Sequence, residues 1–148
     1  MKSRALSVTS KLIGKKEVWE LITDIDHWSE WDFNIERSAY FGSKDGEKRL
    51  FKVKHRNYLI TAAGVVEEFR PYENFTFRIR LAGAELYRKY VMEDTDEGLK
   101  ITIITSVSGF LGWLWNLVVV KRIVKDTPED LTIIVEQIKN RYEKQCAF

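Results

Sequence analysis

The feature that most constrains the fold is a long C-terminal segment, residues 109–142, in which apolar residues recur at helical spacing. It opens with a very apolar run over residues 110–120. It closes with an amphipathic stripe formed by Leu131, Ile134, Val135, Ile138 and Tyr142. Most of the chain before this segment alternates apolar and polar residues with the period of a strand. The pattern therefore predicts a sheet that packs against a C-terminal helix.

A helix start signal lies inside this C-terminal segment. Thr127 is a favourable N-cap residue, Pro128 suits the first helical position, and Glu129 and Asp130 place acids in the first turn. A proline inside a helix removes one backbone hydrogen bond. We therefore expect a kink or a short break near Asp126, with one helix before it and one after it.

The rest of the chain predicts seven strands and two short helices. The helices are expected over residues 15–24 and 26–31, directly after the first strand. The strands are expected over residues 5–13, 35–41, 48–55, 58–69, 75–81, 85–94 and 99–108. Nearly all of these strands are joined by short turns, which favours an antiparallel sheet. The fold class is therefore α+β, in one domain over residues 1–148.

Composition limits the classes of function. Lys and Arg number 24 against 22 Asp and Glu, so the chain lacks the basic excess that nucleic-acid binding requires. One cysteine, Cys146, allows no internal disulfide and no thiolate metal site. The N-terminal residues show no apolar signal segment, and we expect a cytoplasmic protein. Aromatic residues reach 13%, with five Trp, which indicates a thick core or an aromatic-lined cavity.

The stretch from residue 16 to residue 31 carries a family resemblance. It reads KEVWELITDIDHWSEW and resembles the "VW…l.D…W..W" signature of the SRPBCC proteins. This superfamily includes START-related domains, the major birch pollen allergen, and the polyketide cyclase/dehydrase and lipid-transport families. Ser108-Gly109 followed by an apolar helix is similar to the family's C-terminal end, although the break at Pro128 departs from many members.

The resemblance implies a helix-grip fold, in which a curved antiparallel sheet wraps around the C-terminal helix and leaves a cavity for a hydrophobic ligand. A curved sheet cannot press flat against one helix, so large inward side chains either fill the gap or line it. The side chains that we predict to line the cavity are Phe51, Val53, His55, Phe77, Ile79, Tyr87, Ile101, Ile103, Trp113 and Leu117.

Two sets of polar residues have alternative interpretations. His55 shares a strand face with Phe51 and Val53, so it is either a base or donor in the cavity or, as we favour, a strand-end histidine near solvent. The acidic cluster consists of Asp24, Asp26, His27, Glu30 and Asp32. It is either a metal site or, as we favour, a solvated turn with capping acids, because its spacing matches no ligand motif.

No catalytic constellation is visible. The sequence lacks a Gly-x-Ser-x-Gly motif and a phosphate-binding glycine loop, and we expect no metal and no cofactor. Arg78 and Arg80 are interpreted as outward charges, and Trp28 and Trp31 as packing residues.

The sequence is consistent with three functions. We favour a carrier or sensor that binds a hydrophobic small molecule or lipid. The first alternative is a polyketide cyclase/dehydratase-like enzyme that acts on a hydrophobic substrate. The second is a membrane- or partner-contacting domain that uses the helix over residues 110–120, because Trp113 and Trp115 lie near Lys121 and Arg122. That run is shorter than the roughly 20 residues of a membrane span. The oligomeric state is left open.

Overall fold

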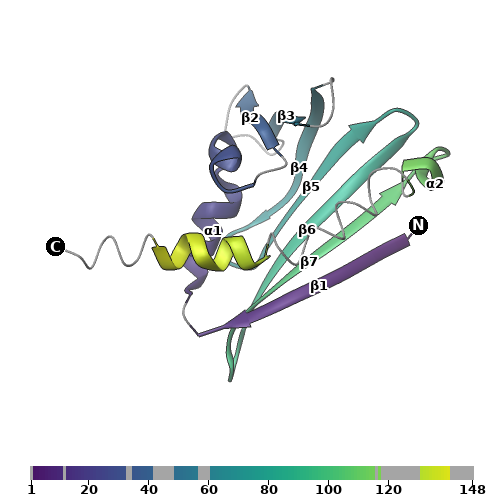
Figure 1. The fold of residues 1–148 in the computed structure, drawn as a ribbon. Helices are drawn as coiled ribbons and strands as arrows, with labels where there is room; N and C mark the ends of the chain where they lie inside the picture. The colour runs from purple at the N-terminus through teal and green to yellow at the C-terminus, as the bar shows by residue number, and fades with distance from the viewer. Residues whose placement is uncertain are drawn as a thin grey trace.

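The computed structural model describes residues 2–11, 13–32, 35–41, 49–56, 61–115, 117 and 131–140. It contains one seven-stranded antiparallel sheet in the order β1-β7-β6-β5-β4-β3-β2 (Figure 1). The strands are β1 (Lys2–Ser10), β2 (Ile35–Phe41), β3 (Arg49–His55), β4 (Ala62–Arg70), β5 (Asn74–Leu81), β6 (Ala84–Thr95) and β7 (Gly98–Ser108). Strands β2 to β7 pair in chain order, and β1 closes the other edge against β7. The predicted curved antiparallel sheet is thus confirmed.

Helices stand at both ends of the chain. Helix α1 (Lys15–Thr23) and the 3₁₀ helix η1 (Ile25–Glu30) follow β1, as the sequence predicts. Helix α2 (Gly112–Trp115) follows β7, and residues 131–140 form a further helical segment. The predicted break near Asp126 lies outside the described residues. No helix among the described residues is long and apolar enough to cross a membrane.

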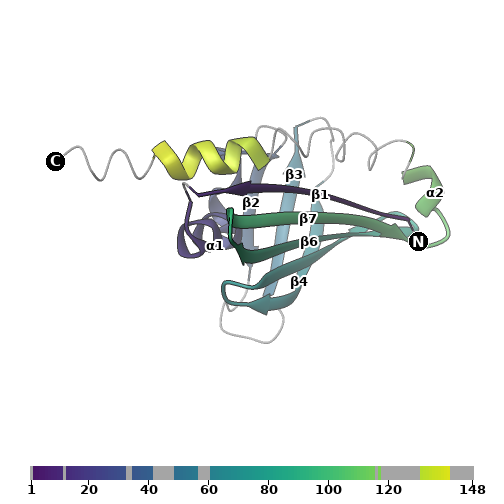
Figure 2. The same ribbon diagram turned by 90° about the horizontal axis from the view of Figure 1, so that it is seen from below.

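The sheet is strongly curved. In Figure 2, strands β2 and β3 turn away from the direction of β1, β7 and β6. The pairing register shifts between Ile35 and Arg37 in β2 and between Val66 and Glu68 in β4. Such irregularities bend a strand and increase its twist. They therefore give this part of the sheet its curl.

The core lies on one face of the sheet, which we call the inner face. Its side chains alternate along each strand, as in the buried Leu86, Tyr90 and Met92 of β6. The helical segment 131–140 lies on the inner-face side (Figure 2), and its Leu131, Ile134 and Ile138 belong to the same core cluster. The part of the predicted amphipathic stripe from Leu131 to Ile138 therefore packs as expected for a helix that covers a sheet, and Tyr142 lies outside the described residues.

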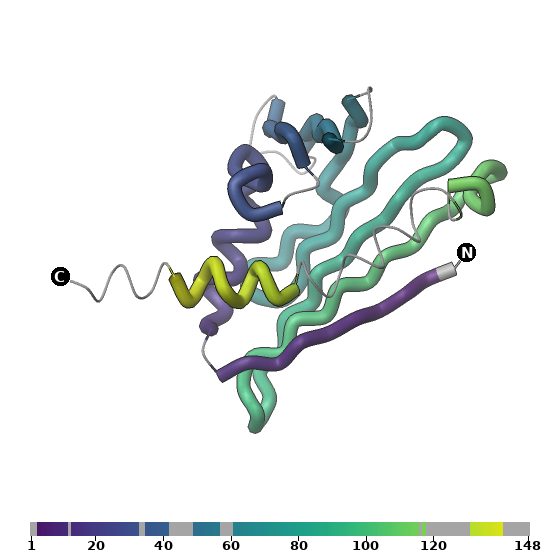
Figure 3. The backbone as a smooth tube through the Cα atoms, viewed as in Figure 1, coloured from purple at the N-terminus to yellow at the C-terminus, as the bar shows by residue number. Residues whose placement is uncertain are grey.

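Helix α2 lies far from the helical segment 131–140. It sits beside the turn between β5 and β6 and near the start of β1 (Figure 3). The Trp115 indole N–H donates to the Ala82 carbonyl at 2.6 Å, and the Leu111 amide donates to the Gly83 carbonyl at 3.0 Å. These bonds fix α2 to the end of the sheet.

Candidate ligand cavity

A small cavity lies between the inner face of the sheet and the turn that follows η1. Its described lining residues are Trp28, Trp31, Asp32, Ile35, Val53, His55, Phe77, Ile79, Leu86, Arg88 and Tyr90. Its volume is about 40 Å³. A single buried water needs roughly 10–15 Å³ of such space, whereas pockets for drug-sized ligands measure about 300–1,000 Å³. The lining side chains must therefore move apart before anything larger than a few waters can enter.

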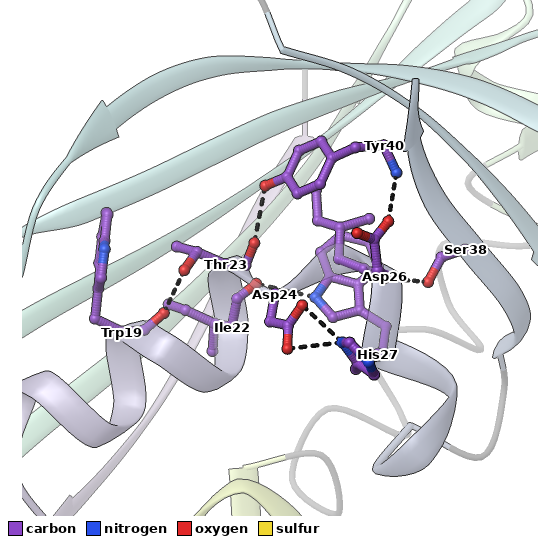
Figure 4. Close-up of polar contacts among 10 residues, drawn as sticks. Trp19, Ile22, Thr23, Asp24, Asp26, His27, Ser38 and Tyr40 are labelled. Atoms are coloured by element: carbon purple, nitrogen blue, oxygen red, sulfur yellow. Dashed lines mark hydrogen bonds and ion pairs between the residues drawn. The ribbon is translucent and has the colours of Figure 1, made fainter. Parts of the chain in front are cut away.

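The turn that carries Trp28, Trp31 and Asp32 is held to the sheet by a set of hydrogen bonds (Figure 4). The Trp28 indole N–H donates to the Ile22 carbonyl at 2.9 Å. The Tyr40 amide donates to the Asp26 carboxylate at 2.8 Å, and the Tyr40 hydroxyl donates to the Thr23 carbonyl at 2.8 Å. Because the junction of α1 and η1 is tied to β2, η1 and its Trp28 are held over the inner face.

Aromatic rings form most of the apolar wall. Trp28 packs on Phe77 with ring centroids 5.2 Å apart and on Phe51 at 5.6 Å. Phe77 lies 6.2 Å from Tyr90 on the neighbouring strand. These separations are within the range of favourable aromatic pairs. The wall therefore contains rings from η1, β5 and β6, and the Phe51 ring of β3 packs against them.

Besides Tyr90, three ionisable side chains line the same cavity. Arg88 of β6 is buried, whereas Asp32 and His55 are partly buried. Burial lowers the pKa of His55 below its ordinary 6.5, and the positive charge of Arg88 lowers it further, while Asp32 acts in the opposite direction. His55 is therefore neutral at pH 7, with one nitrogen that donates and one that accepts.

The Trp31 indole N–H is a buried donor of the cavity wall that has no acceptor within the described part of the chain. The Trp31 side chain is only 4% exposed. An indole N–H can donate but not accept. Since buried polar groups are usually paired, this N–H marks a place where an acceptor atom of a ligand or water is favoured.

The structure brings together some of the residues predicted for the cavity. Val53, His55, Phe77 and Ile79 line it. His55 ends β3, so it occupies the strand end and the cavity wall at once. Three further predicted residues, Phe51, Ile101 and Ile103, are buried in the core and do not line the cavity.

Three predicted cavity residues lie elsewhere. Tyr87 lies on the outer face of the sheet, where its hydroxyl donates to Glu85 at 2.9 Å, because successive residues of a strand point to opposite faces. Trp113 and Leu117 are 64% and 54% exposed, because α2 packs at the end of the sheet rather than across its inner face. These placements correct the sequence prediction.

The sequence prediction missed Trp28, Trp31, Asp32, Ile35, Leu86, Arg88 and Tyr90 as lining residues. For β6 a signal was present. Leu86, Tyr90 and Met92 are apolar at alternate positions, while Glu85 and Lys89 occupy the positions between them. That alternation places Arg88 on the inner face and Tyr87 on the outer face.

The acidic cluster around η1 is divided among structural contacts. His27 pairs with Asp24 at 2.9 Å, and the hydrogen bond and charge of Asp24 raise the pKa of this exposed histidine. Asp26 accepts from the Tyr40 backbone, and Asp32 lines the cavity. Within the described part of the chain, no group of three or more His, Cys, Asp or Glu side chains is placed to hold a metal ion.

On the outer face, Arg78 is placed as the sequence predicts. It pairs with Glu67 at 2.9 Å and with Glu85 at 3.4 Å. These side chains are partly exposed, and such pairs contribute little to stability. Arg78 lies on the opposite face of the sheet from the cavity.

No family model and no curated protein matches this chain. Solved structures do match it. Hypothetical protein jhp0584 from Helicobacter pylori is similar with a TM-score of 0.76 and 18% identity, over 92% of this chain and 87% of that one. The di-domain ARO/CYC StfQ from the steffimycin biosynthetic pathway has a TM-score of 0.76 and 9% identity, over 96% of this chain and 51% of StfQ.

The structure of Ara h 8.0201 is similar with a TM-score of 0.69 and 12% identity, over 93% of this chain and 97% of that one. The chain has the helix-grip fold. The resemblance of residues 16–31 to SRPBCC proteins implied this fold, and neighbours that include ARO/CYC proteins and Ara h 8.0201 share it. Identities this low establish the architecture, and the chain spans about half of StfQ. What the site does must come from its own residues.

Proposed function

We propose that the protein binds a hydrophobic small molecule, as a carrier or sensor, between the inner face of the sheet and the helices. The observation that carries this proposal is the cavity walled by Trp28, Trp31, Phe77 and Tyr90, with polar groups confined to a few positions. Apolar walls with a few placed polar groups are typical of ligand sites. The ARO/CYC proteins among the fold neighbours are consistent with a ligand of this kind.

The small volume of the cavity defines how binding must occur. At about 40 Å³ the cavity holds no organic ligand as it stands. The proposal therefore requires that binding be coupled to movement of the wall. Side-chain rearrangements at binding sites are common even where the backbone moves little.

Binding is tested with the uncharged fluorescent probe N-phenyl-1-naphthylamine. The wild type is expected to bind the probe with increased, blue-shifted emission. Val53→Phe places a larger ring on the cavity wall and is expected to weaken binding at least tenfold. Leu50→Phe adds a ring on the same strand at an exposed position and serves as the control. If the wild type does not bind, or if Val53→Phe binds as well as Leu50→Phe, the proposal is wrong.

A second candidate is proton-transfer catalysis of the cyclase/dehydratase kind. The observation that favours it is that His55, neutral at pH 7, lines the cavity with Asp32 and Arg88. A neutral imidazole beside a carboxylate can remove a proton next to a carbonyl, and a nearby cation stabilises the oxyanion that forms. Hydrogen–deuterium exchange at the methyl group of 2-acetonaphthone tests this activity. Exchange above the buffer rate that His55→Gln abolishes supports it, and exchange equal to buffer contradicts it.

A further inference from the structure

The polar groups of the cavity wall are rich in hydrogen-bond donors. Arg88 is only 9% exposed, and its guanidinium presents five N–H donors and no acceptor. The Trp31 indole adds a buried donor that has no partner among the described residues. Both side chains line the same cavity. A molecule that enters this cavity therefore meets one positive charge and more than one donor.

The cavity wall offers fewer hydrogen-bond acceptors than donors. Asp32 is the only carboxylate among the described lining residues, and it is partly exposed. Neutral His55 offers one acceptor nitrogen. A carboxylate takes two N–H groups of a guanidinium, so Arg88 can bind Asp32 and still offer donors to a second acceptor. Together with the Trp31 indole N–H, Arg88 therefore makes the wall suited to an anionic oxygen group.

We propose that the ligand is an apolar molecule that ends in a carboxylate, with its apolar body against Trp28, Phe77 and Tyr90 and its carboxylate bound by Arg88 and the Trp31 indole N–H. This inference rests on the proposed function and adds the chemical class of the ligand. Charge-assisted hydrogen bonds in a water-poor site are stronger than neutral ones. Arg88 thereby selects an apolar acid over its uncharged isostere.

The test is a displacement experiment with two nearly isosteric ligands. 1-Naphthaleneacetate and 1-naphthaleneacetamide have the same ring and the same number of heavy atoms, and they differ in the charge of the end group at pH 7. Each is titrated against bound N-phenyl-1-naphthylamine. The acid is expected to displace the probe at a concentration at least about tenfold lower than the amide, the difference typical of one hydrogen bond to a charged group.

Matched variants assign the preference to the inner arginine. Arg88→Met is expected to make acid and amide equal competitors, whereas Arg78→Met on the outer face is expected to retain the preference. The Trp31 indole signal in a ¹⁵N–¹H spectrum, assigned through its loss in Trp31→Phe, is expected to move downfield with the acid. This spectrum of the wild type needs no arginine variant, so the test stands even where Arg88→Met does not fold.

The outcomes separate this inference from the proposed function. Equal displacement of a bound probe by acid and amide contradicts the carboxylate and leaves ligand binding in place. A preference for the acid that persists in Arg88→Met also contradicts it. If the probe, the acid and the amide all fail to bind, both proposals are wrong.

Discussion

At the scale of single residues, Gly64 of β4 and Phe51 of β3 form the tightest constraint on the inner face. They are directly paired across the two strands, and the Phe51 ring is fully buried over Gly64. A Cβ atom at position 64 would overlap the Phe51 ring. Since Phe51 also supports Trp28, the glycine lets the sheet approach the turn that walls the cavity.

Gly64→Ala is therefore expected to destabilise the protein by about 1–3 kcal/mol, because the added methyl displaces a buried ring. Gly112→Ala is the control, since a Cβ there meets no atom within 4 Å and an alanine suits a helix. Urea unfolding of both variants measures the difference. Equal midpoints for the two variants contradict the packing described for Phe51.

His55 gives the residue-scale prediction for pH. Its pKa in the folded protein lies below 6.5 because of burial and Arg88, and Asp32 opposes this shift. As the pH falls, His55 therefore binds a proton at a higher pH in the unfolded chain than in the folded protein. The contribution of neutral His55 to the free energy of unfolding is present above pH 6.5. It is lost as the pH falls from 6.5 toward the pKa of His55 in the folded protein.

His55→Gln is expected to reduce this loss of stability between pH 7.5 and pH 5, as measured by urea unfolding at both values. The exposed His27 has a raised pKa and acts in the opposite direction, so the comparison is made between each variant and the wild type at each pH. A wild type whose pH dependence is unchanged by His55→Gln contradicts the buried, neutral state of this histidine.

At the scale of elements, the hydrogen bonds between β2 and the junction of α1 and η1 place the tryptophans of the cavity wall. Tyr40→Phe removes the donor to the Thr23 carbonyl and is expected to cost about 1 kcal/mol. The exposed Tyr72 provides the matched control Tyr72→Phe. Thermal unfolding compares the two variants, and no difference between them would show that the Tyr40 hydroxyl does not hold the turn.

The periodicity of apolar residues predicted the helices and strands well, because each of these elements depends on a local sequence pattern. Alternation located the strands from β2 to β7, and the apolar stripe from Leu131 to Ile138 located the helical segment that packs on the core. The run over residues 110–120 was predicted to place Trp113 and Leu117 in the cavity, and both of these side chains lie outside it. Its pattern indicates a helix, but which neighbour that helix meets is set by the bonds of Leu111 and Trp115 to the β5–β6 turn.

At the scale of the whole molecule, the polar part of the site draws on distant parts of the chain. Asp32 follows η1, His55 ends β3 and Arg88 lies in the middle of β6. They meet only because the sheet curls and the turn folds over it. No spacing in the sequence encodes that meeting, so sequence reasoning reached the fold and only part of the apolar wall, and it did not bring these three polar side chains together.

Two parts of the molecule present aromatic side chains to a hydrophobic ligand. One is the cavity with Trp28 and Trp31. The other is the end of the sheet, where Phe110 is 81% exposed and Trp113 is 64% exposed. All five tryptophans of the chain lie in described residues. Trp28 and Trp31 report on the cavity, and Trp113 and Trp115 report on the end of the sheet.

The most direct measurement is therefore a ¹⁵N–¹H spectrum of the five indole groups, assigned by single Trp→Phe variants and titrated with N-phenyl-1-naphthylamine. The account predicts that the Trp28 and Trp31 signals shift with the ligand, while those of Trp113 and Trp115 stay in place. Shifts confined to Trp113 and Trp115 would contradict it, since the molecule would then bind at the end of the sheet and not inside the curved sheet.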